Sequence, residues 1–129
     1  NELGGEMVSK PINFMGTHRN SYPFLEDDSN YEGILKMEAR LATEEFCYLP
    51  TAALETQESQ LQSGDIIALA TSIKGLDVTH TGIAIRQKNG RIHLLHASTS
   101  GAVVISKEPL VDYLKKIKHN IGVIVARPL

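Results

Sequence analysis

Two strand-forming runs, residues 79–85 and 92–98, each carry a histidine and are separated by a short polar turn at residues 88–90. Aliphatic and β-branched residues fill much of both runs, a pattern that predicts a β-hairpin. His80 lies near the start of the first strand, and His96 lies near the end of the second. Because these strand ends meet in a hairpin, the sequence predicts that the two imidazole rings are neighbours.

The length of the hairpin loop decides whether the two rings share a face. A two-residue type I′ turn at the Asn-Gly pair would place His80 and His96 on opposite faces of the sheet. A three-residue loop, with Gly90 in the left-handed conformation, pairs Gln87 with Arg91 instead. The histidines then become diagonal neighbours on one face, about 7–8 Å apart at the backbone. A shift of the pairing by one residue would move every side chain to the other face of the sheet. We therefore predict the three-residue loop.

The residue pattern of the N-terminal third predicts a loop followed by one helix. Residues 1–28 are rich in Gly, Pro, Asn and Asp, so we expect mostly loop, with short extended pieces at residues 7–8 and 12–15. Apolar residues then recur at helical spacing over residues 29–46. Ser29 or Asn30 is the expected cap, and a proline a few residues beyond residue 46 ends the helix.

The remainder predicts a compact β-rich unit. A buried stripe is expected on its last long helix, formed by Leu110, Tyr113, Leu114 and Ile117. The order of elements indicates a single α+β domain of residues 1–129 around an antiparallel sheet. The expected elements are strands 65–71, 79–87, 91–97, 103–106 and 122–127, with helices 51–54 and 109–118.

Composition narrows the possible partners and compartments. The net charge of −2 provides no basic field, so we expect no nucleic acid partner. No apolar run approaches the length of a membrane span. The one cysteine, Cys47, forms no internal disulfide and leaves the redox compartment open. The chain starts at Asn1, so we expect a processed or truncated product from which any targeting peptide has been removed.

Metal binding by the histidines is not expected. His93 and His96 have a spacing that suits a metal pair on a helix, but positions three apart on a strand point to opposite faces. No cysteine or carboxylate cluster completes a zinc site nearby. His93 is therefore expected to be structural. The small residues Gly82 and Ala84, on the face of His80, either serve packing or leave room for a helix end to approach that histidine.

Residues 64–67, 80–85 and 96–101 resemble the second half of NlpC-type cell-wall cysteine peptidases, which share a papain-like core. The closer resemblance is to the N-acetylmuramoyl-L-alanine amidase-like branch, through residues 13–18, 75–80 and 93–98, and it covers the chain from about residue 12 onward. The resemblance implies that this chain is the antiparallel sheet half of a papain-like fold with flanking helices. It also implies that His80 is the general base and His96 the residue that orients it.

The resemblance further implies hydrolysis of an amide bond in a peptidoglycan or muropeptide substrate, without a cofactor, in the bacterial periplasm or cell envelope. The bond lies either between muramic acid and L-alanine or within the stem peptide. His18 and Tyr22 match a segment of the family and are expected to line the substrate cleft; the alternative, common for polar residues in a loop, is that they satisfy backbone groups or face solvent. Ser98 or Thr99 either adds hydrogen bonds there or caps the strand end.

The chain departs from the family at the nucleophile, because the Asp-Cys-Thr-like motif is absent. A second chain or an upstream segment is the expected source of that cysteine. Cys47, predicted near the C-terminal end of a helix and beside two carboxylates, is poorly placed to form a thiolate and is expected to be structural. The alternatives are an inactive cell-wall-binding module and an interaction domain with coincidental histidines. A papain-like core that lacks one helix should also expose apolar sheet surface, which predicts a second chain or self-association.

Overall fold

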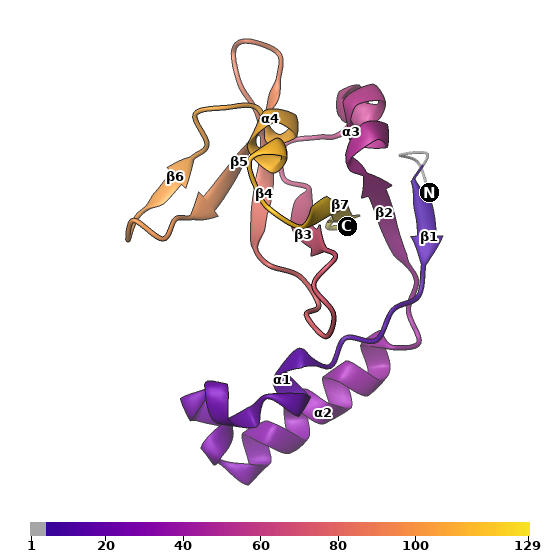
Figure 1. Ribbon diagram of the computed structural model, residues 1–129, viewed down its shortest axis with the longest axis vertical. Coiled ribbons are helices and arrows are strands. Elements are labelled where there is room, and N and C mark those ends of the chain that lie inside the picture. The colour runs from indigo at the N-terminus through magenta and orange to yellow at the C-terminus, as the bar shows by residue number, and fades with distance from the viewer. Residues whose placement is uncertain (1–4) are drawn as a thin grey trace.

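The computed structural model describes residues 5–129, and its centre is one antiparallel sheet of seven strands (Figure 1). The order across the sheet is β1-β2-β7-β3-β4-β5-β6. This sheet with a few helices around it confirms the expected α+β class. The strands are β1 (Glu6–Val8), β2 (Phe46–Pro50), β3 (Ile66–Thr71), β4 (Thr81–Arg86), β5 (Ile92–Ala97), β6 (Val103–Ile105) and β7 (Asn120–Ala126).

Helices α3 (Thr51–Gln57) and α4 (Leu110–Lys115) cover one face of the sheet and enclose the core. A short 3-10 turn, η3 (Glu58–Gln60), follows α3. Burial of each large aliphatic side chain contributes about 1.5–3 kcal/mol of transfer free energy, which makes this layer the main source of stability. The core comprises Leu49, Leu54, Leu61, Ile67, Leu69, Ala84, Ile92, Leu94, Leu110, Val111, Leu114, Val123 and Val125.

The buried stripe expected on α4 is confirmed. Leu110 and Leu114 are buried, and Tyr113 and Ile117 pack against the same core from partly buried positions. Pro109 is the N-cap residue of this helix and precedes its first turn, one position earlier than expected. The stripe therefore fixes α4 against the sheet and directs Tyr113 toward the end of β5.

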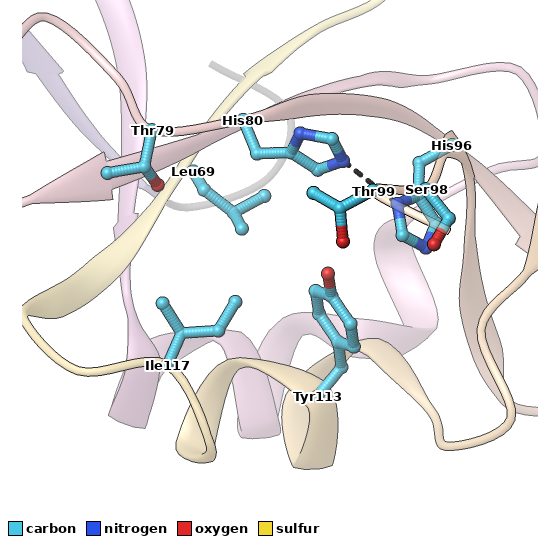
Figure 2. A pocket seen from close by; sticks show the side chains of 8 residues that line it. All are labelled: Leu69, Thr79, His80, His96, Ser98, Thr99, Tyr113 and Ile117. Carbon is cyan, nitrogen blue, oxygen red and sulfur yellow. Dashed lines mark hydrogen bonds between the residues drawn. The ribbon is translucent and has the colours of Figure 1, made fainter. Parts of the chain in front are cut away.

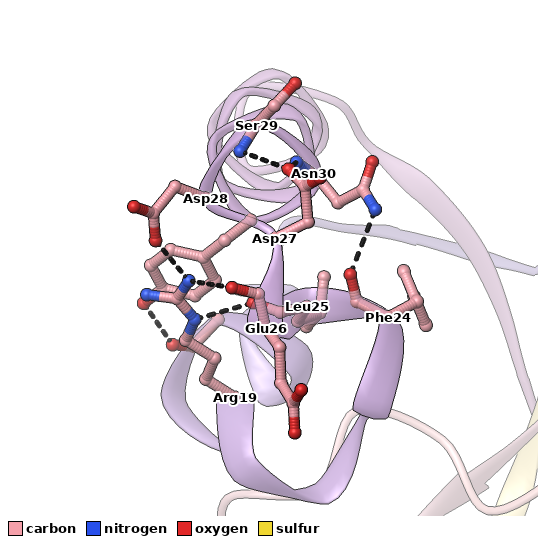
Figure 3. Close-up of polar contacts among 10 residues, drawn as sticks. Arg19, Phe24, Leu25, Glu26, Asp27, Asp28, Ser29 and Asn30 are labelled. Carbon is pink, nitrogen blue, oxygen red and sulfur yellow. Dashed lines mark hydrogen bonds and ion pairs between the residues drawn. The ribbon is translucent and has the colours of Figure 1, made fainter.

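The N-terminal segment forms a small helical unit beyond one end of the strands (Figure 1). Arg19 holds this unit together, as Figure 3 shows. Its guanidinium donates from Nε to the Leu25 carbonyl at 2.7 Å and from Nη2 to Asp28 Oδ1 at 2.6 Å. The same group lies 4.2 Å from the ring centroid of Tyr31, a cation–π contact. The elements of the unit are α1 (Phe14–Thr17), η1 (Arg19–Ser21), η2 (Pro23–Glu26) and α2 (Asp28–Leu41).

Three predictions for this part of the chain are wrong, wholly or in part. The cap of α2 is Asp27, whose carboxylate accepts from the Ser29 amide at 2.8 Å, so the helix begins before the expected Ser29 or Asn30. The helix then ends at Leu41, because residues 46–50 pair with β1 and β7 as strand β2. The extended piece expected at 12–15 is also wrong in part, because Phe14 begins α1. Residues 1–4, part of the expected N-terminal loop, lie outside the described range.

A buried ion pair fastens the C-terminal end of the chain to the start of β3. Asp65 is 1% exposed, and its carboxylate accepts from Arg127 Nε at 2.7 Å and from Arg127 Nη2 at 2.9 Å. The Gln62 amide donates a third hydrogen bond to Asp65 at 2.8 Å. These contacts satisfy both carboxylate oxygens, as a buried carboxylate requires.

The sheet face opposite α3 and α4 carries an apolar row that no described element covers. The row crosses four strands through directly paired residues, and we call it the outer row: Ile66, Ile83, Leu95 and Ile105. Ile66, Ile83 and Ile105 are 45%, 43% and 41% exposed. The expected exposure of apolar sheet surface is therefore present. None of the helices within residues 5–129 combines the length and apolarity needed to cross a bilayer.

Candidate active site

The register of the β4–β5 hairpin brings both histidines to one face. Ile83 pairs with Leu95, so the next position, Gly82, lies opposite His96. At the other end, the Gln87 amide donates to the Arg91 carbonyl at 3.0 Å. Gly90 has a φ of 80°, the left-handed conformation that the expected loop requires. The three-residue loop is confirmed.

His80 and His96 contact each other directly. His80 Nε2 lies 2.8 Å from His96 Nδ1, and the ring planes cross at 88° with centroids 5.0 Å apart. The His80 backbone is held by β3, because its carbonyl accepts from the Leu69 amide at 2.8 Å. His96 is 9% exposed, whereas His80 is partly exposed. The pair therefore has a fixed inner ring and an outer ring that reaches the surface.

Electrostatics favours a neutral His96. Burial lowers the pKa of His96, and the neighbouring His80 lowers it further, because a protonated ring would be desolvated and would repel a second cation. Neutral imidazole has one ring nitrogen that accepts and one that donates. His96 can therefore accept a hydrogen bond from His80 without carrying charge.

A pocket of about 260 Å³ opens beside this pair (Figure 2). No Asp, Glu, Lys or Arg is among its lining residues. Besides the histidines, it presents hydroxyl groups and two aliphatic side chains. Such a surface suits an uncharged polar ligand with a small apolar group. The lining residues are Leu69, Thr79, His80, His96, Ser98, Thr99, Tyr113 and Ile117.

Cys47 lies far from this pocket. It is a residue of β2, on a strand and not at the end of a helix as expected, and β7 and β3 separate β2 from β4. Neighbouring strands are about 4.8 Å apart, so three steps place Cys47 roughly 14 Å from the strand that follows His80. Burial raises the pKa of the Cys47 thiol, which further disfavours the thiolate. In this conformation Cys47 does not reach the histidine pair.

His93 is a structural histidine, as expected. Its ring is buried on the other face of β5, where Nδ1 donates to the Ser106 carbonyl at 2.8 Å and Nε2 accepts from Asn89 Nδ2 at 3.2 Å. Within residues 5–129 no group of three or more His, Cys, Asp or Glu side chains is arranged to hold a metal ion.

The structure shows what Gly82, Ser98 and Thr99 do, which the sequence left open. A Cβ atom at Gly82 would lie 2.6 Å from Leu94 Cδ1 and 2.8 Å from the Leu95 carbonyl oxygen, so glycine serves strand packing there. Ser98 Oγ accepts from the Ser100 amide at 3.2 Å, so this hydroxyl caps the turn after β5. Thr99, by contrast, presents its hydroxyl to the pocket (Figure 2).

His18 and Tyr22 do not line the histidine pocket. The ring of His18 is exposed and stacks on Phe14 with centroids 4.0 Å apart. Tyr22 lines a second cavity of about 440 Å³, formed between the N-terminal unit and the loop before His80. The two cavities have Thr79 in common. Tyr22 is thus adjacent to the histidine site, whereas His18 lines neither cavity.

With this geometry established, comparison with known proteins gives the family. Residues 3–123 match the model of the AmiA-like family, described as N-acetylmuramoyl-L-alanine amidase-like. The chain belongs to this family. No curated protein sequence matches the AmiA-like chain.

Solved structures resemble the AmiA-like chain over almost all of its length. An N-acetylmuramoyl-L-alanine amidase from Bacteroides uniformis ATCC 8492 is 35% identical, with a TM-score of 0.75 over 97% of this chain and 54% of that chain. A Bacteroides fragilis protein described as a candidate xylanase is 38% identical, with a TM-score of 0.74 over 97% of this chain and 55% of that chain. The AmiA-like chain thus spans a little over half the length of these proteins.

Two residues of the site region were not expected from the sequence. Asp77 accepts from the Phe14 amide at 2.9 Å and from the Asn13 amide at 3.2 Å, and so fastens the N-terminal unit to the loop before His80. Tyr113 was expected only as a packing residue, yet it lines the pocket with its ring 5.5 Å from that of His96. No local pattern marks a long-range cap such as Asp77, whereas the position of Tyr113 at the edge of the α4 stripe was a usable signal.

Proposed function

We propose that this AmiA-like chain supplies the histidine half of a cysteine amidase site that hydrolyses an amide bond in peptidoglycan. The observation that carries the proposal is the 2.8 Å contact between His80 Nε2 and His96 Nδ1 beside a pocket. Acyl transfer by a thiol needs a base, and that base needs a partner that fixes its tautomer. The family description and the Bacteroides uniformis amidase support peptidoglycan as the substrate class.

The contact determines which nitrogen of His80 acts as the base. If His80 Nε2–H donates to His96 Nδ1, the lone pair of His80 lies on Nδ1 and is available to a nucleophile. His96 in its neutral form is the acceptor that this arrangement needs, and the lowered pKa of His96 keeps it neutral. His96 is therefore the positioning residue, and His80 is the proposed general base.

The proposed reaction proceeds in two balanced steps. His80 Nδ1 takes the thiol proton, the sulfur attacks the substrate carbonyl, and the C–N bond breaks as His80 returns the proton to the departing amine. Water then attacks the thioester with His80 again as the base, which releases a carboxylic acid and regenerates the thiol. No cofactor takes part in either step.

The sulfur in this proposal comes from outside the described residues, on an upstream segment or a second chain. The roughly 14 Å between Cys47 and β4 supports that source. The greater length of the solved relatives also supports it. We propose that the complete site has an NlpC-type papain-like core. The AmiA-like chain provides its sheet, and the upstream segment or second chain provides the nucleophile. The corresponding location is the bacterial periplasm or cell envelope.

We propose that the substrate runs from the histidine pocket into the neighbouring cavity lined by Tyr22. Thr79 lines both cavities, so a single extended ligand can occupy both. The rings of Tyr22 and Phe14 meet edge to face with centroids 6.5 Å apart, and the His18 ring stacks on Phe14. In this proposal Tyr22 contacts the substrate, and His18 supports that wall of the cleft.

Xylan hydrolysis, the activity named for the Bacteroides fragilis protein, is less well supported by this pocket. Glycoside hydrolysis usually needs two carboxyl groups that flank the scissile bond. The residues around His80 and His96 include no Asp or Glu. The second candidate is therefore an inactive cell-wall-binding module, which retains the cleft without the sulfur.

The test uses the natural protein that contains this chain and a soluble N-acetylmuramoyl peptide as substrate. We expect His80→Ala to lower kcat at least about a hundredfold, the usual scale of general base catalysis. His96→Ala should lower kcat less and broaden the pH profile. His119→Asn is the matched control, because His119 is exposed, lies outside the pocket and has a left-handed φ of 66° that asparagine tolerates.

Alkylation separates the enzyme from the inactive module. Iodoacetamide should abolish hydrolysis in the wild type and equally in Cys47→Ala, because the reacting sulfur is not Cys47. Binding of the peptide without any hydrolysis would favour the cell-wall-binding module. Activity that disappears in Cys47→Ala would contradict the external nucleophile.

A further inference from the structure

The histidine pocket contains hydroxyl groups that no described residue uses. Within residues 5–129, the hydroxyls of Thr99 and Tyr113 have no hydrogen-bond partner. Figure 2 shows both pointing into the space below the His80 ring. Hydroxyl groups arranged around a pocket that lacks charged side chains suit a neutral carbonyl or amide of a ligand.

Tyr113 is the better anchored of the two. Its backbone amide donates to the Pro109 carbonyl at 2.9 Å, and its neighbours Leu110 and Leu114 are buried in the core. Its ring meets the His96 ring at 62° with centroids 5.5 Å apart. Thr99, by contrast, is exposed and lies in the turn after β5. The rigid helix thus holds the Tyr113 hydroxyl at a fixed position beside the two rings.

We propose that Tyr113 is a specificity-determining residue, whose hydroxyl donates a hydrogen bond to an uncharged peptide carbonyl next to the bond that is cleaved. This inference rests on the proposed amidase function. Leu69 and Ile117 line the same pocket and receive the small apolar side chain that accompanies this carbonyl. Tyr113 acts on substrate binding, while proton transfer belongs to His80.

Tyr113→Phe tests the proposal, because it removes the hydroxyl and keeps the ring against His96. The natural protein is titrated with a soluble N-acetylmuramoyl peptide by calorimetry, and hydrolysis is followed in parallel. Loss of one neutral hydrogen bond should weaken binding and raise KM by about five- to tenfold, with kcat changed less than about twofold. A merely structural role would not produce this split between KM and kcat.

Tyr48→Phe is the matched control. Its hydroxyl donates to the Ile121 carbonyl at 2.9 Å on the far side of the sheet, so this variant should lose some stability and keep the wild-type KM. Tyr113→Phe should show the reverse, with unchanged urea unfolding and a raised KM.

Two results overturn the inference, and they are distinguishable. If the wild type hydrolyses the peptide and Tyr113→Phe binds it equally well, Tyr113 has no role in specificity and the amidase function stands. If the wild type neither binds nor hydrolyses the peptide, both proposals fail together.

Discussion

At the scale of single residues, the histidine pair should make stability depend on pH near neutrality. The pKa of His96 is lowered in the folded state by burial and by His80, relative to about 6.5 in the unfolded chain. Between these two values the unfolded state binds more protons, so stability falls as the pH decreases below about 6.5. Urea unfolding at pH 7.5 and 5.5 should show this loss, and His96→Asn should reduce it. An equal loss in the variant would contradict the assignment.

The tautomers of the pair are also directly measurable. Long-range ¹H–¹⁵N spectra near pH 7.5 should show His80 protonated at Nε2 and His96 accepting at Nδ1, the arrangement that leaves His80 Nδ1 free to act as a base. A proton on His96 Nδ1 would reverse the donor and contradict the proposed mechanism.

The buried ion pair between Asp65 and Arg127 should contribute strongly to stability. Arg127→Ala leaves a buried carboxylate without its partner, which typically costs about 3–5 kcal/mol. Chemical denaturation measures this cost. Lys115→Ala is the control, because its ion pair with Glu55 joins two half-exposed side chains and should contribute less than about 1 kcal/mol. Comparable losses in the two variants would show that burial does not govern these pairs.

This ion pair also has a defined acid dependence. Burial raises the pKa of Asp65, but the hydrogen bonds from Arg127 and Gln62 outweigh it, so the net pKa lies below its ordinary value. The stabilisation is present above the unfolded pKa of about 3.9 and is lost as the pH falls through the lower folded value.

At the scale of elements, the packing of β4 on β5 depends on the missing side chain at position 82. Gly82→Ala would place a Cβ atom 2.6 Å from Leu94 Cδ1 and 2.8 Å from a backbone oxygen, so the strands must shift. We expect a loss of about 1–3 kcal/mol and a disturbed contact between His80 and His96, visible in their ring resonances. Gly33→Ala is the matched control. Nothing lies within 4 Å of that new Cβ, and in helix α2 alanine should stabilise by about 0.4–1 kcal/mol.

The hairpin was predictable from the sequence because its determinants are local. Side chains alternate between the two faces along each strand, and the turn residues with Gly90 fix which positions pair. The His80–His96 contact follows from that register. Strand β2 was not predictable in the same way. Residues 46–50 continue directly from a helical pattern, and only pairing with β1 and β7, which are distant in sequence, makes them a strand. The prediction that Cys47 lies near the end of a helix was wrong for that reason.

At the scale of the whole molecule, the outer row predicts association. Ile66, Ile83 and Ile105 form part of one exposed apolar row, a kind of surface that soluble monomers usually cover. We expect residues 1–129 alone to bind a hydrophobic dye or self-associate, as measured by fluorescence and light scattering. Ile83→Thr should reduce both effects. Ile73→Thr, in the loop before His80, is a control of equal exposure, at 43% for each residue, and should change neither. A dye-free monomer would contradict this prediction.

The three-residue loop has a consequence for how related sequences can vary in length. Residues added beyond the Gln87–Arg91 pair only enlarge the tip and leave the pairing of Gly82 with His96 unchanged. A single residue inserted between that pair and either histidine would turn one imidazole to the opposite side of the sheet. Homologues that keep the ring contact should therefore tolerate insertions and deletions at the tip, and should show none in the stretches that join the tip to the two rings.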